Sequence, residues 1–472
     1  MSTTKDLTRR DFVKSLGLAG MTLPAVTVIG RIGSDELVTS EAFGGFLIRR
    51  HAAADPPYQV DDSIYRRFNQ HNEVFSRAVW DKEIVDAEAP YAKVPLDHIM
   101  ANDPGFNRMD YAFYTASWTV ATVQGNGAGA VGGSNGGLYS WQPLPGSFLS
   151  RARLTEMGPW DMAGYTPREV TDIVKKAALF YGASMAGIAE LDERWIYSHR
   201  DTKGYSDPPN IVAPILFEDV DVPEERADKT LVIPRSMKYV ISMAFEMDYD
   251  GYQYPIGGPA NAATGNGYSK TAFTAASLAE FIRGMGYHAI PSGNCTGLSI
   301  PIAVDAGLGE LGRNGMLITP KYGPRVRLGK VITDMPLTPD SPISFGATEF
   351  CEICGKCADT CPAGGIIKGQ NQRTYDARNI SNNPGVYKWP VDVVACHMVW
   401  STSGMSCHNC IRVCPFNKPE GWLHDATRSL IGMRSGAADQ AILALDDASQ
   451  YATEEDSREY WKKDNFIHIK NA

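Results

Sequence analysis

The spacing of apolar positions is most regular after residue 165, where it predicts alternating helices and strands. Thr166 begins a helix, because threonine can cap, Pro167 suits the first turn and Glu169 can reach back to the cap. The apolar residues that follow recur with helical spacing. They predict one buried helix face, made by Val170, Ile173, Val174, Ala177, Ala178 and Tyr181.

Short apolar runs in the same region predict buried strands at 185–191, 239–247, 288–291, 316–319 and 326–334. Longer runs predict helices at 269–285 and 298–306. The fold class is therefore α+β, with a layered α/β core over residues 166–345. Residues 426–472 form a tail with helical and charged segments and no chemistry that we can name.

Residues 36–165 lack this periodicity, and we expect an irregular unit rich in aromatic side chains. Its Gly127-x-Gly129-x-x-Gly132 run formally matches a dinucleotide motif, but no helix can open after it, so we interpret it as a flexible loop. A second run, Gly307-Leu308-Gly309-Glu310-Leu311-Gly312, has a helix before it and a strand after it, the reverse of that motif. Gly307 and Gly309 could instead let the backbone approach another large ligand.

Composition and charge further limit the class of protein to which this chain can belong. The chain has 472 residues, of which 43% are hydrophobic and 21% charged, so several packed domains are expected and global disorder is not. The net charge of -9 argues against a nucleic-acid-binding protein, which usually carries a basic face.

The first 35 residues indicate export. Arg9-Arg10 precedes a mostly apolar stretch, which is typical of a twin-arginine signal. The alternative is a short helix on a membrane surface. No later stretch reaches the roughly 18 apolar residues that cross a bilayer. Because the twin-arginine route carries folded proteins, it suits an enzyme whose cofactors are inserted before export.

Eight of the nine cysteines lie in one short window, which favours a metal site over a disulfide framework. Cys351-x-x-Cys354-x-x-Cys357-x-x-x-Cys361-Pro362 has the bacterial ferredoxin spacing, and a second half follows with a stretched first spacer. Crossed ligation predicts one [4Fe–4S] cluster on Cys351, Cys354, Cys357 and Cys414. It predicts a second cluster on Cys361, Cys396, Cys407 and Cys410. The alternative is two zinc ions, but the cysteine triplet and the two Cys-Pro endings favour iron.

Several features together resemble the reductive dehalogenases, which are corrinoid and iron–sulfur enzymes of organohalide respiration. These features are the twin-arginine start, Ala306-Gly307-Leu308-Gly309, Arg325-Val326-Arg327-Leu328 and the modified second cysteine motif. The resemblance runs from residue 8 to about residue 425 and is densest from Tyr268 to Pro415. The Gly-Leu-Gly turn and the paired cysteine motifs are also similar to those of epoxyqueuosine reductase, a corrinoid relative.

The resemblance implies a nitroreductase-like corrinoid-binding core and a ferredoxin-like domain over residues 346–425. Electrons would pass through the two clusters to a base-off corrinoid, reduce its cobalt to Co(I), and replace a halogen of a small organohalide by hydrogen. The D-x-H-x-x-G signature of some corrinoid proteins is absent. The resemblance also implies anaerobic respiration, a respiratory electron donor and a small membrane anchor protein on the outer face of the cytoplasmic membrane. It leaves a homodimer open.

The resemblance also assigns site residues. Tyr268, in Gly267-Tyr268-Ser269-Lys270, matches the proton donor of the family, Asn294 matches the residue that positions it, and Arg327 matches the arginine that favours the tyrosinate. Trp400 matches a tryptophan near the substrate pocket. Taken singly, each could equally serve packing, capping or the surface.

Two rival functions stay open at this point. An enzyme acting on RNA, like epoxyqueuosine reductase, is opposed by the export signal and the acidic balance. An electron-transfer subunit of an exported redox complex is opposed by the large α/β core, which a chain of clusters does not need.

Overall fold

The computed structural model describes residues 37–40, 46–124, 137–144, 160, 162–201, 211–419, 422–432, 434–449 and 454–463. The twin-arginine region and the Gly127–Gly132 run lie outside the described residues. A central antiparallel sheet with strand order β3-β8-β12-β9 organises the core. Its strands are β3 (Met185–Glu190), β8 (Tyr239–Glu246), β12 (Val326–Thr333) and β9 (Ala289–Ser292). All four were predicted to within one or two residues.

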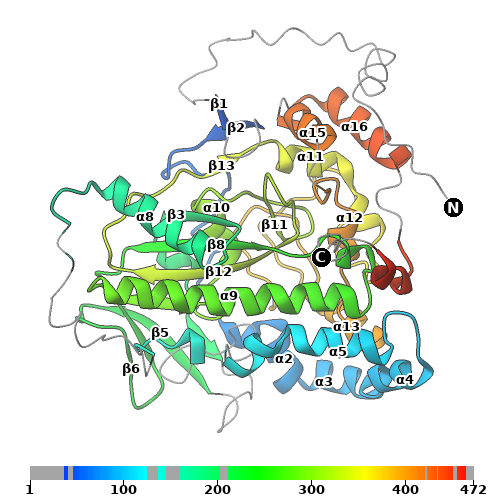
Figure 1. Ribbon diagram of the computed structural model, residues 1–472, viewed down its shortest axis with the longest axis horizontal. Helices are drawn as coiled ribbons and strands as arrows, with labels where there is room; N and C mark the ends of the chain where they lie inside the picture. The colour runs from blue at the N-terminus through cyan, green and yellow to red at the C-terminus, as the bar shows by residue number, and fades with distance from the viewer. Residues whose placement is uncertain are drawn as a thin grey trace, which may run out of the picture.

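Successive side chains of β8 point to opposite faces of this sheet, and apolar residues on both sides explain why both faces are covered. Ile241, Met243 and Phe245 face α8 (Pro167–Phe180) and α9 (Gly258–Gly284). Val240 and Ala244 face a second core that contains α10 (Ser299–Asp305). Figure 1 shows α9 running along one side of the sheet. The capping box predicted for α8 is present, since Thr166 and Glu169 bond each other reciprocally.

The long helix α9 differs from its predicted bounds, because it begins eleven residues earlier than expected, at Gly258. Glycines disfavour a helix by about 1 kcal/mol each, and the run before residue 269 holds several of them. Here they are needed for close packing. A Cβ at Gly258 would lie 2.6 Å from the Asp110 Cβ, and one at Gly265 would lie 2.2 Å from the Trp118 ring. Tyr268 therefore sits inside a helix and not at its start.

The region over residues 36–165 is more regular than predicted. Its described part contains helices, one of which, at residues 108–117, packs against α9 (Figure 1). They are α2 (Val74–Trp80), α3 (Lys82–Glu88), α4 (Val94–Ala101) and α5 (Arg108–Ser117). These helices are short and carry exposed apolar residues such as Leu96 and Met100, so no single buried stripe marks them.

Smaller sheets complete the core. One has strand order β4-β5-β7-β6, from β4 (His199–Asp201), β5 (Val212–Glu218), β7 (Leu231–Pro234) and β6 (Glu224–Glu225). Another joins β1 (Leu37–Ser40), β2 (Phe46–Arg50) and β13 (Ile343–Ser344), and a hairpin pairs β10 (Glu310–Leu311) with β11 (Leu317–Ile318).

The cysteine region forms short helices at one end of the core (Figure 1). They are α11 (Ala347–Cys354), α12 (Lys356–Asp359), α13 (Val393–Ser403) and α14 (Asn409–Arg412). The predicted tail is helical, with α15 (Trp422–Gly432) and α16 (Gly436–Ser449), so the expected boundary at residue 426 falls inside a helix. The tail packs on the body of the protein, because the Trp461 indole donates to Asp110 at 2.7 Å.

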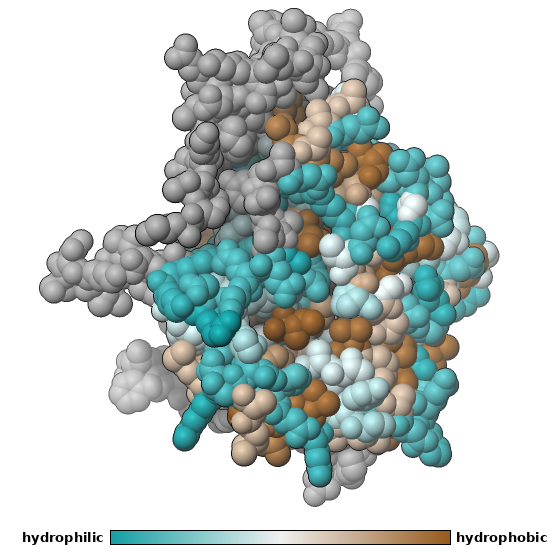
Figure 2. All heavy atoms as spheres, turned by 90° about the vertical axis from the view of Figure 1, so that its right-hand side faces the viewer, coloured by the Kyte–Doolittle hydropathy of each residue, from teal (hydrophilic) through white to brown (hydrophobic). Residues whose placement is uncertain are grey.

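Figure 2 shows a face on which apolar side chains lie in small groups between hydrophilic ones. In the described parts of the chain, no helix combines the length and the apolar content that crossing a membrane requires.

Candidate functional site

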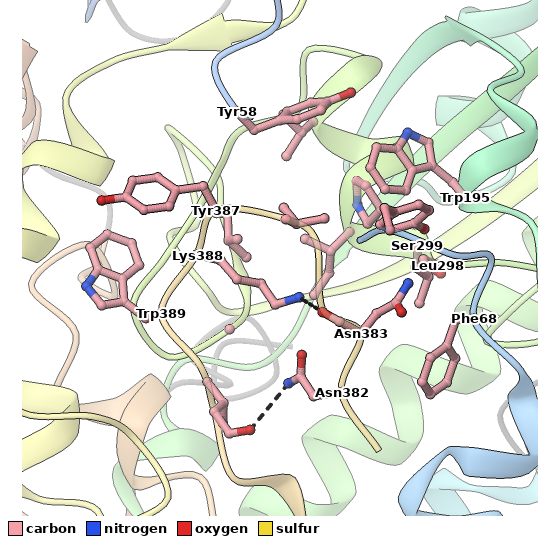
Figure 3. A pocket seen from close by; sticks show the side chains of 18 of the residues that line it. Tyr58, Phe68, Trp195, Leu298, Ser299, Asn382, Asn383, Tyr387, Lys388 and Trp389 are labelled. Carbon is pink, nitrogen blue, oxygen red and sulfur yellow. Dashed lines mark hydrogen bonds between the residues drawn. The ribbon is translucent and has the colours of Figure 1, made fainter. Parts of the chain in front are cut away.

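A cavity of about 450 Å³ lies between the α/β core and the cysteine region. A volume of this size is typical of small-molecule and cofactor sites. Figure 3 shows aromatic side chains on opposite sides of it, with polar side chains of residues 382–388 between them. The aromatic walls are made by Tyr58, Phe68, Trp195, Tyr197, Tyr387 and Trp389.

The three residues assigned to proton transfer meet at the edge of this cavity. Asn294 lines the cavity, and its Nδ2 donates a hydrogen bond of 3.0 Å to the Tyr268 hydroxyl. Arg327 Nη1 donates to the same oxygen at 3.4 Å, and its guanidinium lies 4.9 Å from the centre of the tyrosine ring. Two donors on one phenolic oxygen stabilise the anion that proton release would leave. The structure thus brings Tyr268, Asn294 and Arg327 together, while their catalytic roles stay predictions.

The charge of Arg327 is poorly compensated. Burial lowers its pKa, but the neighbouring Tyr268 and Tyr252 outweigh burial, so that the pKa is raised overall. Its Nε is buried without a hydrogen-bond partner, and no described carboxylate forms an ion pair with it. A buried cation in this state attracts a negative charge, such as a tyrosinate.

Glycines of α9 set this geometry. A Cβ at Gly267 would lie 2.8 Å from Arg327 Cγ, so only glycine lets the arginine approach the helix so closely. The Trp118 ring packs over Tyr268 with 5.2 Å between ring centres, next to Gly265. The sequence placed Trp118 only within a unit rich in aromatic side chains. Its place on Tyr268 could not be found without the position of α5 against α9.

The first predicted set of cysteines surrounds a small cavity. Cys351, Cys354, Cys357 and Cys414 all line it, although the last is about sixty residues from the others in sequence. This is the arrangement that crossed ligation requires. In the described residues, no three His, Cys, Asp or Glu side chains converge on a point where one metal ion could sit. Four sulfurs around one cavity suit a [4Fe–4S] cluster, which is held by four thiolates.

The second predicted set also gathers. Burial, together with the nearby Cys407 and Cys361, raises the pKa of Cys396 to about 12. Burial likewise raises the pKa of Cys410, next to Cys396, Cys407 and Cys361. Buried thiols that resist ionisation need a metal centre to hold them as thiolates. The fit of both sets to iron–sulfur clusters is therefore good, and the assignment of each ligand stays a prediction.

The glycines of the second motif pack closely against backbone of the core. Gly307 and Gly309 do not line the cavity. A Cβ at Gly307 would lie 2.5 Å from the Ser341 carbonyl oxygen, and one at Gly309 would lie 2.1 Å from that of Ile318. Their position gives no support to the expected cofactor contact, because the close approach that the glycines permit is to other backbone.

The residues after these glycines connect the core to the cysteine region. The buried Glu310 carboxylate accepts bonds from the backbone N–H groups of Phe345, Ala347 and Thr348 and from the Thr348 hydroxyl, at the start of α11. Arg313 donates to the backbone carbonyls of Cys351, Glu352, Ile367 and Gly369. The core thereby fixes the helix that carries Cys351 and Cys354.

Trp400 lies on α13, one turn after Cys396, and outside the cavity wall. Its ring packs on Phe75, with 5.5 Å between ring centres. The indole N–H lies within reach of the Cys396 sulfur, whose pKa it lowers by hydrogen bonding. Its role near a substrate stays a prediction.

The segment between the two cysteine halves was missed as part of the site. Residues 362–395 separate Cys361 from Cys396, and part of this insertion forms one wall of the cavity. The contributing residues are Arg373, Ser381, Asn382, Asn383, Val386, Tyr387, Lys388, Trp389, Val391 and Val393. The only signal in the sequence was the unusual length of the segment between Cys361 and Cys396.

Comparisons with known proteins agree with this architecture. Residues 56–337 match the family model described as reductive dehalogenase subunit, and residues 350–417 match the 4Fe-4S double cluster binding domain. The second match decides for iron–sulfur clusters against zinc. Both matches lie within the range over which the sequence showed its resemblance.

Two curated relatives are tetrachloroethene reductive dehalogenases. That of Sulfurospirillum multivorans is 42% identical over 301 residues, which are 62% of this chain and 59% of the relative. That of Desulfitobacterium hafniense is 35% identical over 360 residues, which are 69% of this chain and 65% of the relative. The chain thus spans about three fifths of the length of these relatives.

Solved structures show the same fold. The catabolic reductive dehalogenase NpRdhA superposes with a TM-score of 0.60 at 21% identity, over 87% of this chain and 50% of that one. A reductive dehalogenase whose structure is reported to suggest a mechanism for B12-dependent dehalogenation gives 0.61 at 21% identity, over 88% and 50%. Since the family model alone covers more than half of the sequence, this chain belongs to the reductive dehalogenase family.

Proposed function

We propose that this protein is an oxidoreductase that replaces a halogen of a small organohalide by hydrogen, with a corrinoid supplied with electrons by two [4Fe–4S] clusters. The observation that carries the proposal is the meeting of Asn294, Arg327 and the Tyr268 hydroxyl at the edge of a large cavity beside the cysteine sets. The α/β core would then be the nitroreductase-like, corrinoid-binding unit expected from the sequence.

The cavity suits a corrinoid. A corrin ring presents two broad apolar faces and a rim of amides, and this cavity offers aromatic walls with polar groups between them (Figure 3). The residues that would hold the ring are those of the walls, including Tyr387, Trp389, Trp195 and Leu298. When bound, a corrinoid supplies the reduced cobalt that cleaves a carbon–halogen bond.

The chain supplies the proton. Replacing a halogen by hydrogen consumes two electrons and one proton. A tyrosine keeps its proton at neutral pH and can deliver it when the resulting anion is stabilised. Arg327 and Asn294 both donate to the Tyr268 oxygen, and the buried arginine charge favours the anion. Trp118 covers the tyrosine ring and keeps water from one side.

The test combines metal analysis with one substitution. We expect about one cobalt and eight irons per chain from the stoichiometry of the proposal. Tyr268→Phe should lower turnover of chlorinated ethenes, ethanes or benzenes by about 100-fold or more while metal content is retained, since general acids contribute about that much. Tyr375→Phe is the matched control, because its hydroxyl donates to Gln59 on the surface.

Other outcomes would decide against the proposal. Iron without cobalt would favour an electron-transfer subunit. Normal turnover by Tyr268→Phe would remove that tyrosine from the reaction. An enzyme acting on RNA is the second candidate only through its weaker likeness to epoxyqueuosine reductase, 29% identical over 126 residues.

Location and partners are part of the same proposal. Arg9-Arg10 and the apolar stretch after it support export by the twin-arginine route. A peripheral place on the outer face of the cytoplasmic membrane, a small membrane anchor protein, a respiratory electron donor and anaerobic respiration follow by analogy with the family. Fractionation of cells that produce the protein with both arginines changed to lysine tests the export step, since the variant should remain in the cytoplasm.

A further inference from the structure

One wall of the large cavity carries a cation without an anion. Lys388 lies in the segment between the cysteine halves, and its ammonium group lies in the middle of the view in Figure 3. It donates a hydrogen bond to the backbone oxygen of Asn383. No described carboxylate forms an ion pair with it, and burial alone lowers its pKa to about 8. The group is therefore still charged at neutral pH, with one neutral acceptor.

The other charges of the cavity wall are engaged. Arg373 Nε lies 2.9 Å from Glu352, and the Glu310 carboxylate accepts four hydrogen bonds at the start of α11. Glu73, which also lines the cavity, interacts with His397. Two lysines elsewhere in the core are engaged as well, since Lys175 has Asp340 at 2.6 Å and the buried Lys330 donates to the Gly293 carbonyl and the Ser299 hydroxyl. Among the charged side chains of the cavity wall, Lys388 thus stands apart as a cation without a carboxylate partner in the described chain.

The ammonium group is held in place before any ligand arrives. The backbone of Lys388 pairs with Thr374 in both directions, at 2.8 and 3.1 Å. The Asn383 amide donates to the Arg66 carbonyl at 3.0 Å, and the Asn382 amide donates to that of Val391 at 3.3 Å. A cation fixed in this way binds an anion with little loss of conformational freedom.

The shape and charge of the cavity together define the ligand. The walls suit a broad apolar molecule, while Lys388 requires one negative charge with oxygen acceptors. A complete cobamide has both, because the chain that carries its lower base contains a phosphodiester with a single charge. We propose that the Lys388 ammonium binds the phosphodiester of a complete cobamide and so selects it over a corrinoid that lacks the nucleotide tail. The inference rests on the proposed corrinoid chemistry and adds a determinant of cofactor choice.

The test measures binding instead of turnover. The full chain, with both clusters in place but produced without corrinoid, is titrated with hydroxocobalamin and with cobinamide, which has no phosphodiester. Lys388→Met should weaken hydroxocobalamin binding by about 10- to 100-fold, the size expected for one charge-assisted hydrogen bond, and leave cobinamide binding unchanged. Lys388→Arg should retain most of the affinity. Lys368→Met is the matched control, because this exposed lysine lies in the same insertion and forms an ion pair with Asp359.

Each other result has a definite meaning. Equal losses for both corrinoids would show that Lys388 only supports the wall, and no loss for either would remove it from the site; both overturn the inference. Suppose that a Lys388 variant binds hydroxocobalamin normally, but that inorganic phosphate or chloride no longer competes with this binding. Lys388 would then be a site for free anions, and this result also overturns the inference. If the unaltered protein binds neither corrinoid, the proposed function itself fails, and this is distinguishable from the outcomes above.

Discussion

Gly267→Ala is expected to separate the activity of this protein from its stability. The new Cβ would lie 2.8 Å from Arg327 Cγ and 3.2 Å from Met247 Cγ. Carbon atoms in contact normally lie about 3.5–4.0 Å apart, so the arginine must move by roughly 0.7 Å. Its hydrogen bond to the Tyr268 oxygen is already 3.4 Å long, and a movement of this size breaks it.

The two effects can be given magnitudes. A hydrogen bond from a charged group contributes about 1.5–3 kcal/mol, so its loss from the reacting state lowers turnover by about 10- to 100-fold. Alanine favours a helix interior by about 0.5–1 kcal/mol over glycine, while overpacking costs about 1–3 kcal/mol. These terms partly cancel, so the free energy of unfolding changes by less than about 3 kcal/mol.

The assay compares turnover of an organohalide, thermal unfolding and metal content in the same preparations. Lys270→Ala is the control, since this exposed residue lies on the same helix and nearly one turn further on. A Gly267→Ala protein with wild-type turnover would refute the reasoning, because it would show that the close approach of Arg327 to α9 does not matter for the reaction. A fall in turnover together with loss of cobalt or iron would point to a general packing defect.

Two further predictions concern the cluster region and the cavity wall. Arg313 places a positive charge beside the cavity of the first cysteine set. Arg313→Met should therefore lower the midpoint potential of that cluster, and Arg313→Lys should change it less. An electron paramagnetic resonance titration measures both potentials, and an unchanged potential in Arg313→Met would contradict this role. Asp305 accepts hydrogen bonds from Tyr58 and Trp195, and burial raises its pKa to about 6. The stability that Asp305 contributes is present below its unfolded pKa of about 3.9 and is lost as the pH rises through 6. As the pH is lowered from about 7 to about 5, the melting temperature of the wild type should therefore rise relative to that of Asp305→Asn. A difference in melting temperature that does not change with pH would contradict this prediction.

The strands of the central sheet could be predicted because burial on both faces leaves a short apolar run in the sequence. The helix α8 could be predicted from its cap and its stripe. The start of α9 could not, because local propensity counts glycine as a helix breaker, whereas Gly265 and Gly267 are needed for the approach of Trp118 and Arg327. Propensity was overridden here by packing between segments distant in sequence.

The site shows the same division. The cysteine spacing predicted two ligand sets, and the structure places the members of each set near one another, while the assignment of the ligands stays a prediction. The family resemblance selected Tyr268, Asn294 and Arg327, which neither composition nor periodicity would have chosen. Gly307 and Gly309 were expected to contact a cofactor because glycine permits close approach, but the sequence does not say to what. Only the fold shows that the neighbour is backbone.

The two domains build each other's sites. Glu310 and Arg313 of the core form hydrogen bonds with the helix that carries Cys351 and Cys354 and so fix its position. In the opposite direction, the insertion after Cys361 returns to the core and completes its cavity with Tyr387, Lys388 and Trp389. A loss of the first cluster should therefore loosen the wall that faces the cofactor, and an empty cavity should leave Lys388 without its anion. This mutual dependence explains why the spacer between the cysteine halves is long: a ferredoxin that only transfers electrons has no need of it, whereas one that also encloses a cofactor does.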